Sequence, residues 1–188
     1  MKKGWIIVIA VAAVIILAVV AVSGAYNGLV DAELEVDAKE ATIDTMLTRR
    51  ADLIPNLVNT VKGYAAHESE VYTAISDARA KLAGSNTTEE KMEANDELSS
   101  ALSRLLVVVE NYPELKADTQ FIALQDQLEG AENRISTARV DYNEAVKDYN
   151  KKLRRFPTSI IAGMFGFEAR DMYDAPAGDS ETPVVDFN

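Results

Sequence analysis

The side chains that most often carry chemistry are sparse in this 188-residue chain, which contains one histidine and no cysteine. A two-metal site in a helical bundle needs Glu-x-x-His pairs, but His67 has Tyr64 three residues before it. Glu68 and Glu70 leave carboxylate-only binding of a hard cation open, although surface acids on an acidic domain are usually solvated. Nucleophile and nucleotide sites lack support, because there is no cysteine or glycine-rich phosphate loop. We therefore expect no catalytic residue, no cofactor and no metal ligand.

One group of residues is a candidate for binding a partner protein. Two adjacent cations precede an apolar dipeptide and a proline, and the group consists of Arg49, Arg50, Leu53, Ile54 and Pro55. If the chain turns here between two helices, these residues form an exposed tip. The alternative is that the two arginines only complement the dipole at the end of a helix.

A second group is a candidate for contact with lipid. Four cations are followed by aromatic residues in an otherwise apolar stretch, and the group consists of Lys151, Lys152, Arg154, Arg155, Phe156, Phe165 and Phe167. Cations attract anionic headgroups, and aromatic rings favour the interface between membrane and water. Helix-end charge followed by a segment packed on the protein is an equally good interpretation.

A membrane anchor is the clearest element. Eighteen consecutive apolar residues, Trp5 to Val22, follow Lys2 and Lys3, and no charge appears again before Asp31. This run spans about 27 Å as a helix, close to the thickness of a bilayer core. The two lysines place the N-terminus in the cytoplasm and the remainder outside it. A cleavable signal peptide is the competing interpretation, because Ala21-Val22-Ser23 is a small-x-small pattern.

The remainder of the chain has helical periodicity. Apolar spacing predicts helices over 26–50, from Pro55 to about 83, and from a capping box at Thr87 and Glu90 to a point before Pro113. Pro55 either starts the second helix or kinks one continuous helix that reaches 83. The formal net charge of −11 argues against a nucleic-acid ligand.

The last predicted helix has the strongest pattern. Starting from Pro113, large apolar residues recur every seven positions: Phe121, Leu128, Ile135, Tyr142 and Tyr149, with Leu124, Ala131, Ala138 and Ala145 between them. Small residues at the second position of the repeat allow a neighbouring helix to approach closely. A bundle therefore explains this seam better than an isolated two-stranded coiled coil does.

Several short motifs, in order, resemble the LemA family of bacterial membrane proteins. They are YN at 26–27, RRADLIPNLV at 49–58, VKGYA at 61–65, YPELKA at 112–117, YN at 142–143 and 149–150, and FP at 156–157. The resemblance implies an all-α protein with an N-terminal transmembrane helix followed by an up-and-down antiparallel four-helix bundle. It implies no reaction, and associates the family loosely with membrane protein quality control and envelope organisation.

These observations define a domain plan and a function. We expect a transmembrane anchor over 1–25, the bundle over 26–157, an apolar juxtamembrane or bundle-packing segment over 158–170, and a disordered acidic tail over 171–188. The expected protein is a non-enzymatic, single-pass interaction or scaffold protein of the cell membrane. Its partners are the lipid bilayer and unidentified envelope proteins, and homo-oligomers are compatible with the pattern. A carboxylate-based cation-binding or enzymatic bundle is the alternative.

Overall fold

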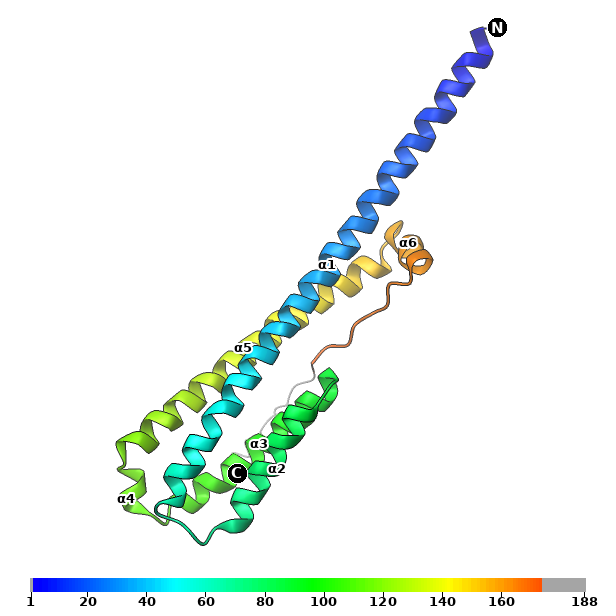
Figure 1. The fold of residues 1–188 in the computed structure, drawn as a ribbon. Helices are drawn as coiled ribbons and strands as arrows, with labels where there is room; N and C mark the ends of the chain where they lie inside the picture. Colours follow the sequence, from blue (N-terminus) through cyan, green and yellow to red (C-terminus); the bar gives the residue numbers. More distant parts are fainter. Residues whose placement is uncertain (1, 174–188) are drawn as a thin grey trace, which may run out of the picture. The chain divides into compact units, whose positions relative to one another are not determined.

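The structure is a computed structural model that describes residues 2–173 (Figure 1). It is all-α, with a long apolar N-terminal helix followed by several antiparallel helices packed against it, as predicted. The predicted acidic tail lies outside the described residues from position 174 onward. The helices are α1 (Lys2–Lys62), α2 (Ser69–Gly84), α3 (Thr88–Val109), α4 (Pro113–Lys116), α5 (Thr119–Arg154) and α6 (Thr158–Phe165).

The chain forms two compact units, and each is described by itself. In the described part, unit 1 contains residues 2–41 and 141–172, and unit 2 contains residues 42–140 and Tyr173. Helices α1 and α5 therefore contribute to both units. Unit 1 holds the apolar end of α1, the end of α5 and all of α6, whereas unit 2 holds α2, α3 and α4 together with the remaining parts of α1 and α5.

Helix α1 passes through Pro55 without interruption, so the predicted break between Arg50 and Pro55 is wrong. A proline inside a helix cannot bond to the carbonyl four residues earlier, and this costs about 3 kcal/mol. Here the carbonyl of Ala51 accepts a hydrogen bond from Nε of Arg79 on α2 at 3.1 Å. Ile54 and Leu57 are buried on either side of the proline. A contact from another helix and continued burial therefore offset the local cost.

The first helix ends at Lys62, and the turn between α1 and α2 covers residues 63–68. The amide of Gly63 bonds to the carbonyl of Thr60, and the amide of Ala65 bonds to that of Val61. The buried hydroxyl of Tyr72 donates to the carbonyl of Ala65 at 2.7 Å and fixes the turn. The alternative of one helix reaching residue 83 is thus correct about Pro55 and wrong about the end of the helix.

The capping box at the start of α3 is confirmed. The Thr87 hydroxyl accepts from the amide of Glu90, and the Glu90 carboxylate accepts from the amide of Thr87. The single helix expected from Pro113 onward is instead two, α4 and α5. Asp118 separates them, because its carboxylate accepts from the amides of Gln120 and Phe121 and caps the start of α5.

The predicted apolar seams largely coincide with the two cores. Unit 2 buries side chains from α1, α2, α3 and α5, among them Ile43, Ile75, Leu98, Leu105 and Ile135. Unit 1 buries Leu29, Val36, Tyr142, Val146 and Tyr149. The repeat on α5 predicted burial of Ala145, but its neighbour Val146 is buried instead, because the helix period of 3.6 drifts against a strict repeat of seven.

Candidate membrane-contact site

The N-terminal part of α1 presents an apolar surface that the rest of unit 1 leaves uncovered. Every side chain from Gly4 to Gly24 is exposed, and the first fully buried residue is Leu29. The helix is long and apolar enough to cross a membrane. An uncovered apolar helix of this length indicates a single-pass membrane anchor.

Helix α6 is apolar on two faces, and only one of them is covered. Ile161 and Ala162 are each 5% exposed and pack on unit 1. Ile160, Met164 and Phe165 remain 56%, 75% and 55% exposed. The helix ends at Gly166, whose φ of 77° is left-handed and whose amide bonds to the carbonyl of Ala162. A helix that is apolar all round normally lies in an apolar environment.

Aromatic contacts place α6 beside the part of α1 where the exposed apolar stretch ends. The ring of Tyr26 on α1 lies 4.9 Å from the ring of Phe165 and 5.7 Å from that of Phe167, measured between centroids. Both arrangements are the tilted or edge-on geometries that aromatic pairs prefer. The exposed face of α6 therefore lies beside the last turns of the exposed part of α1. Phe156, which precedes α6, is 81% exposed.

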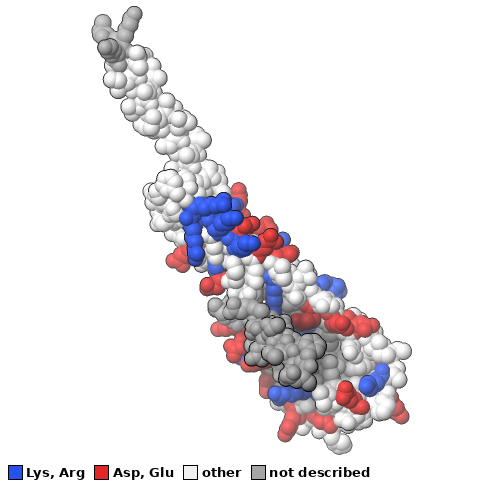
Figure 2. Space-filling model, turned by 180° about the vertical axis from the view of Figure 1, so that it is seen from behind, with Lys and Arg blue, Asp and Glu red and all other residues white. Residues whose placement is uncertain are grey.

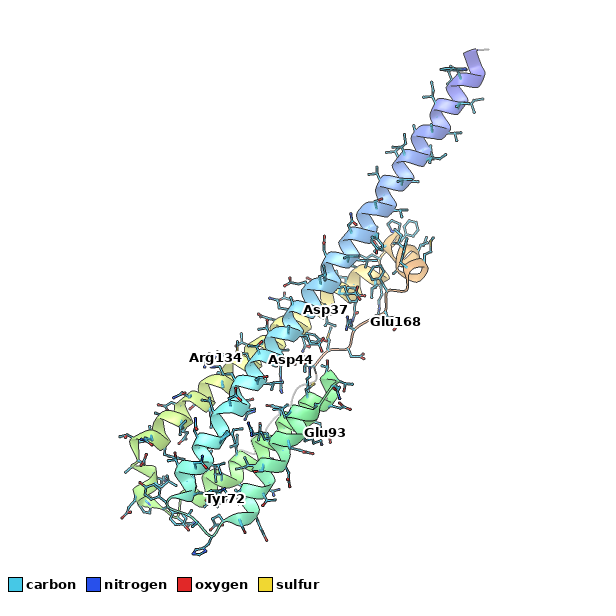
Figure 3. The ribbon with its side chains drawn as sticks, viewed as in Figure 1. Asp37, Asp44, Tyr72, Glu93, Arg134 and Glu168 are labelled. Carbon is cyan, nitrogen blue, oxygen red and sulfur yellow. The ribbon has the colours of Figure 1, made fainter. Side chains whose placement is uncertain are left out.

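The segment after α6 is held on unit 1 by polar contacts. The side chain of Asn150 donates to the backbone carbonyl of Arg170 at 2.8 Å and accepts from the backbone amide of Arg170 at 3.0 Å. The two bonds together resemble those that a neighbouring β-strand would make. The Arg170 guanidinium bonds to Asp37 at 2.9 Å and lies 3.8 Å from Glu33, both on α1. Figure 3 labels Asp37 on α1 and Glu168 on this segment. These contacts fix the position of α6 from its C-terminal side.

Basic side chains at the end of α5 line a shallow groove in unit 1. The groove has a volume of about 510 Å³ and is lined by Lys147, Asn150, Lys151, Arg154, Arg155 and Met172. We call it the basic groove. All four cations are exposed, and within residues 2–173 no salt bridge joins them to a carboxylate. Figure 2 shows Lys and Arg side chains gathered close to the uncharged surface from which the anchor emerges.

The predicted lipid group is thus divided between two environments. Lys151, Arg154 and Arg155 line the basic groove. The ammonium of Lys152 is directed to α1, where it donates to the carbonyl of Gly28 at 3.4 Å. Lys147, Asn150 and Tyr26 were absent from the prediction. The spacing could have indicated Lys147, because it lies four residues before Lys151 and therefore on the same helix face.

Two buried tyrosines lie beneath this surface. Burial raises the pKa of Tyr149, and the nearby Glu33 carboxylate raises it further. Burial and then the Glu40 carboxylate raise the pKa of Tyr142, whose hydroxyl donates to the carbonyl of Asp171. The Tyr149 hydroxyl has no hydrogen-bond partner among the described residues. Both phenols therefore stay neutral and act as packing groups.

The group predicted to form a partner-binding tip lies inside α1, in unit 2. Arg50 and Ile54 are buried, Leu53 and Pro55 are half-buried, and only Arg49 is exposed. The prediction that these residues form an exposed turn is wrong, since the helix continues through them. Two connections of unit 2, residues 63–68 and the segment 110–118 that contains α4, meet where the Tyr64 hydroxyl donates to Asp118 at 3.0 Å.

Arg50 instead forms a polar network inside unit 2. Its guanidinium donates to Asn95 at 2.6 Å and to Ser99 at 3.0 Å, both on α3, and it pairs with Glu132 on α5 at 2.7 Å. The side chain is only 6% exposed, so the network links three helices through one buried charge. Sequence reasoning missed this role because a cation next to an apolar seam has the same spacing as an exposed one.

No group of three or more His, Asp or Glu side chains within residues 2–173 could hold a metal ion. His67 and Glu70 are exposed, and Glu68 is half-buried. A groove in unit 2 is lined by charged and hydroxyl side chains, among them Asp44, Asp52, Ser76, Arg79 and Lys91, and within it Lys91 pairs with Asp44 at 2.7 Å. The basic groove and the exposed apolar face of α6 are suited to surfaces of matching charge and polarity.

Comparison with known proteins assigns the chain to a family. It is 29% identical over 187 residues to magnetosome protein MamQ 2 of Paramagnetospirillum magneticum, which covers 85% of this chain and 68% of that protein. It is 26% identical over 187 residues to magnetosome protein MamQ of Magnetospirillum gryphiswaldense, with the same coverage. Protein LemA of Metamycoplasma hominis is 24% identical over 140 residues, 74% of this chain and 64% of that protein. The LemA family model matches residues 39–187, and the chain belongs to the LemA family.

Proposed function

We propose that this chain is a non-catalytic scaffold protein of the cell envelope, held to the membrane by α1 and by the exposed face of α6. The observation that carries the proposal is the contact of Tyr26 with Phe165 and Phe167, because it puts a second apolar surface next to the anchor. Water would be a poor environment for Phe156, Ile160, Met164 and Phe165 together, whereas the bilayer interface suits them. The basic end of α5 adds an attraction to anionic headgroups.

The scaffold presents its helical bundle to other envelope proteins, as an accessory to protein quality control or envelope organisation. Membership of the LemA family supports this role. The orientation that we propose, with the N-terminus in the cytoplasm and the bundle outside, follows from Lys2 and Lys3 before the span.

The first test measures the depth of α6. Full-length protein carrying Met164→Cys is spin-labelled and placed in zwitterionic bilayers, which is simple because the chain has no cysteine of its own. We expect high accessibility of the label to oxygen and low accessibility to a water-soluble nickel complex. Leu17→Cys in the anchor and Glu144→Cys on exposed α5 serve as the buried and hydrated references. A label at position 164 that behaves like the one at 144 would disprove membrane contact.

The second test addresses topology and partners in intact cells. An impermeant thiol reagent should label Ser100→Cys on exposed α3, and protection that disappears on lysis would reverse the proposed orientation. A photoreactive residue at Val107, which is 64% exposed, should crosslink to envelope proteins if the bundle is a scaffold. Crosslinks confined to second copies of the chain would replace the scaffold with a homo-oligomer.

A further inference from the structure

We propose that the basic groove binds the phosphate of anionic phospholipids and thereby gives the protein a preference for anionic over zwitterionic membrane lipid. The inference rests on the proposed membrane contact and deepens it, because it names the class of lipid that occupies one surface. Three features support it: the arrangement of the four cations, the lack of salt bridges to them among the described residues, and the position of the groove directly before α6 in the chain.

Three of the four cations share one face of α5. Lys151 lies four residues after Lys147 and Arg154 lies three after Lys151, so these side chains project to the same side of the helix, and Arg155 follows directly after its last residue and also lines the groove. Like charges at this spacing repel one another and destabilise a helix slightly. An arrangement with that cost is expected where an anion binds between the cations. Two guanidinium groups and two ammonium groups offer both bidentate and single-point contacts to phosphate oxygens.

The basic groove contrasts with the other cations of unit 1. Lys39 pairs with Glu35 at 3.4 Å, and Arg170 pairs with Asp37 at 2.9 Å. The cations of the basic groove have no such partner among residues 2–173, although the chain as a whole is strongly acidic. Their charge is therefore available to a ligand, and the helix dipole at the end of α5 neutralises only part of it.

The position of the groove points to lipid rather than to a soluble anion. The basic groove ends at Arg155, and α6 begins three residues later with its exposed apolar face beside Tyr26 and the anchor. A phospholipid presents the same two chemistries in the same order, a phosphate next to an apolar chain. Met172 adds an apolar wall to the groove, and Asn150 in the same lining holds the backbone of Arg170 in place.

The test measures lipid selectivity of the full-length protein in vesicles. Spin-labelled phosphatidylglycerol and spin-labelled phosphatidylcholine are each reconstituted with the protein, and the fraction of motionally restricted lipid is compared. We expect the wild-type chain to prefer phosphatidylglycerol by about fivefold, the factor that one cation near an anionic surface supplies. Raising the salt concentration should reduce the preference, because the cations are exposed and screened.

Variants locate the preference. Replacing Lys147, Lys151, Arg154 and Arg155 by Gln should bring the ratio close to one. A matched control replaces four exposed cations of unit 2, namely Lys62, Arg104, Lys116 and Arg134, and should leave the ratio unchanged. Single Lys151→Gln and Arg154→Gln variants, each with an intermediate ratio expected, keep the test decisive if the fourfold variant does not fold.

The outcomes separate this inference from the membrane contact of α6. A label at position 164 that is deep in the bilayer, combined with no lipid preference, would overturn the inference and leave the proposed function intact. A shallow label would overturn the proposed function first. The preference could also appear only in a variant that is truncated after Tyr173. In that case the ligand of the basic groove would be the acidic segment 174–188 of the chain itself, and the inference would again be overturned.

Discussion

Units 1 and 2 use their polar and apolar residues in opposite ways. Unit 2 takes a charge into its interior, where the two terminal nitrogens of Arg50 bond to Asn95 and Ser99 and pair with Glu132. Unit 1 buries two tyrosine rings and leaves cations and apolar side chains of α5 and α6 exposed. A buried charge needs precise partners, whereas an exposed apolar face needs a non-aqueous neighbour. The contrast is the one expected if unit 1 contacts the membrane surface, as we propose, while unit 2 relies on a specific internal structure.

The largest expected effect comes from removing the buried charge. Arg50→Ala should destabilise unit 2 by about 3 kcal/mol, because Asn95 and Glu132 lose their partner and a cavity forms. Hydrogen exchange of the full-length protein, followed by mass spectrometry, would report this loss separately for each unit. Amides of unit 1 should keep their protection. Arg50→Met, which fills the space without a charge, should cost less, and an equal cost for both variants would show that volume has no part in the effect.

The next largest effect on stability concerns the hydrogen bond that supports α1 at Pro55. Arg79→Ala should destabilise unit 2 by about 1 kcal/mol, because the carbonyl of Ala51 loses the hydrogen bond that it accepts from α2. In a Pro55→Ala background the new amide at position 55 can bond to that carbonyl, so Arg79→Ala should then cost little. Thermal melts of the four variants form a double-mutant cycle. Equal costs in the two backgrounds would disprove the compensation.

In the interior of unit 1, removing a buried polar group should increase stability, whereas in unit 2 it should decrease stability. Tyr149→Phe removes a buried hydroxyl without a described partner and should raise stability by about 1 kcal/mol. Tyr142→Phe is the matched comparison, since it deletes a hydroxyl that bonds to the carbonyl of Asp171, and it should lower stability. Hydrogen exchange of unit 1 amides measures both. Destabilisation by Tyr149→Phe would reveal a partner for that hydroxyl and weaken the contrast between the units.

The smallest effect is a dependence on pH. The amide of Phe121 and then the hydroxyl of Tyr64 hold the pKa of Asp118 below its ordinary value. This carboxylate therefore stabilises unit 2 fully above the unfolded-state pKa near 4, and the contribution is lost as pH falls through the lower folded-state pKa. Acid titration of helicity should show less loss for Asp118→Asn than for wild type. Asp126→Asn, an exposed position on α5, should follow the wild-type curve.

The sequence was sufficient for the features that depend on repeated local patterns. The long apolar helix at the N-terminus is visible because eighteen apolar residues follow one another without a charge, and Thr87 with Glu90 specifies a helix start by itself. The seam of α5 was predicted from Phe121, Ile135 and Tyr149. The family resemblance was also confirmed, because it depends on motif order along the whole chain.

The features that sequence reasoning missed depend on residues far apart in the chain. Pro55 breaks a helix in isolation, and only Arg79 on α2 supplies the missing donor. Arg50 has the spacing of a surface cation, and only Asn95 and Glu132 show that it is interior. The candidate lipid group was incomplete for the same reason, since Asn150 and Tyr26 join it through contacts with residues 165–170.

The bond between Arg170 and Asp37 spans 133 residues of sequence and has a consequence for biosynthesis. At a translation rate of about 5–20 residues per second, Arg170 is made about 7–27 seconds after Asp37. The apolar start of α1 is therefore available to the insertion machinery well before α6 exists. We expect the anchor to enter the bilayer first and α6 to reach its place beside Tyr26 only after synthesis has passed residue 170, so the surface next to the membrane is completed after insertion.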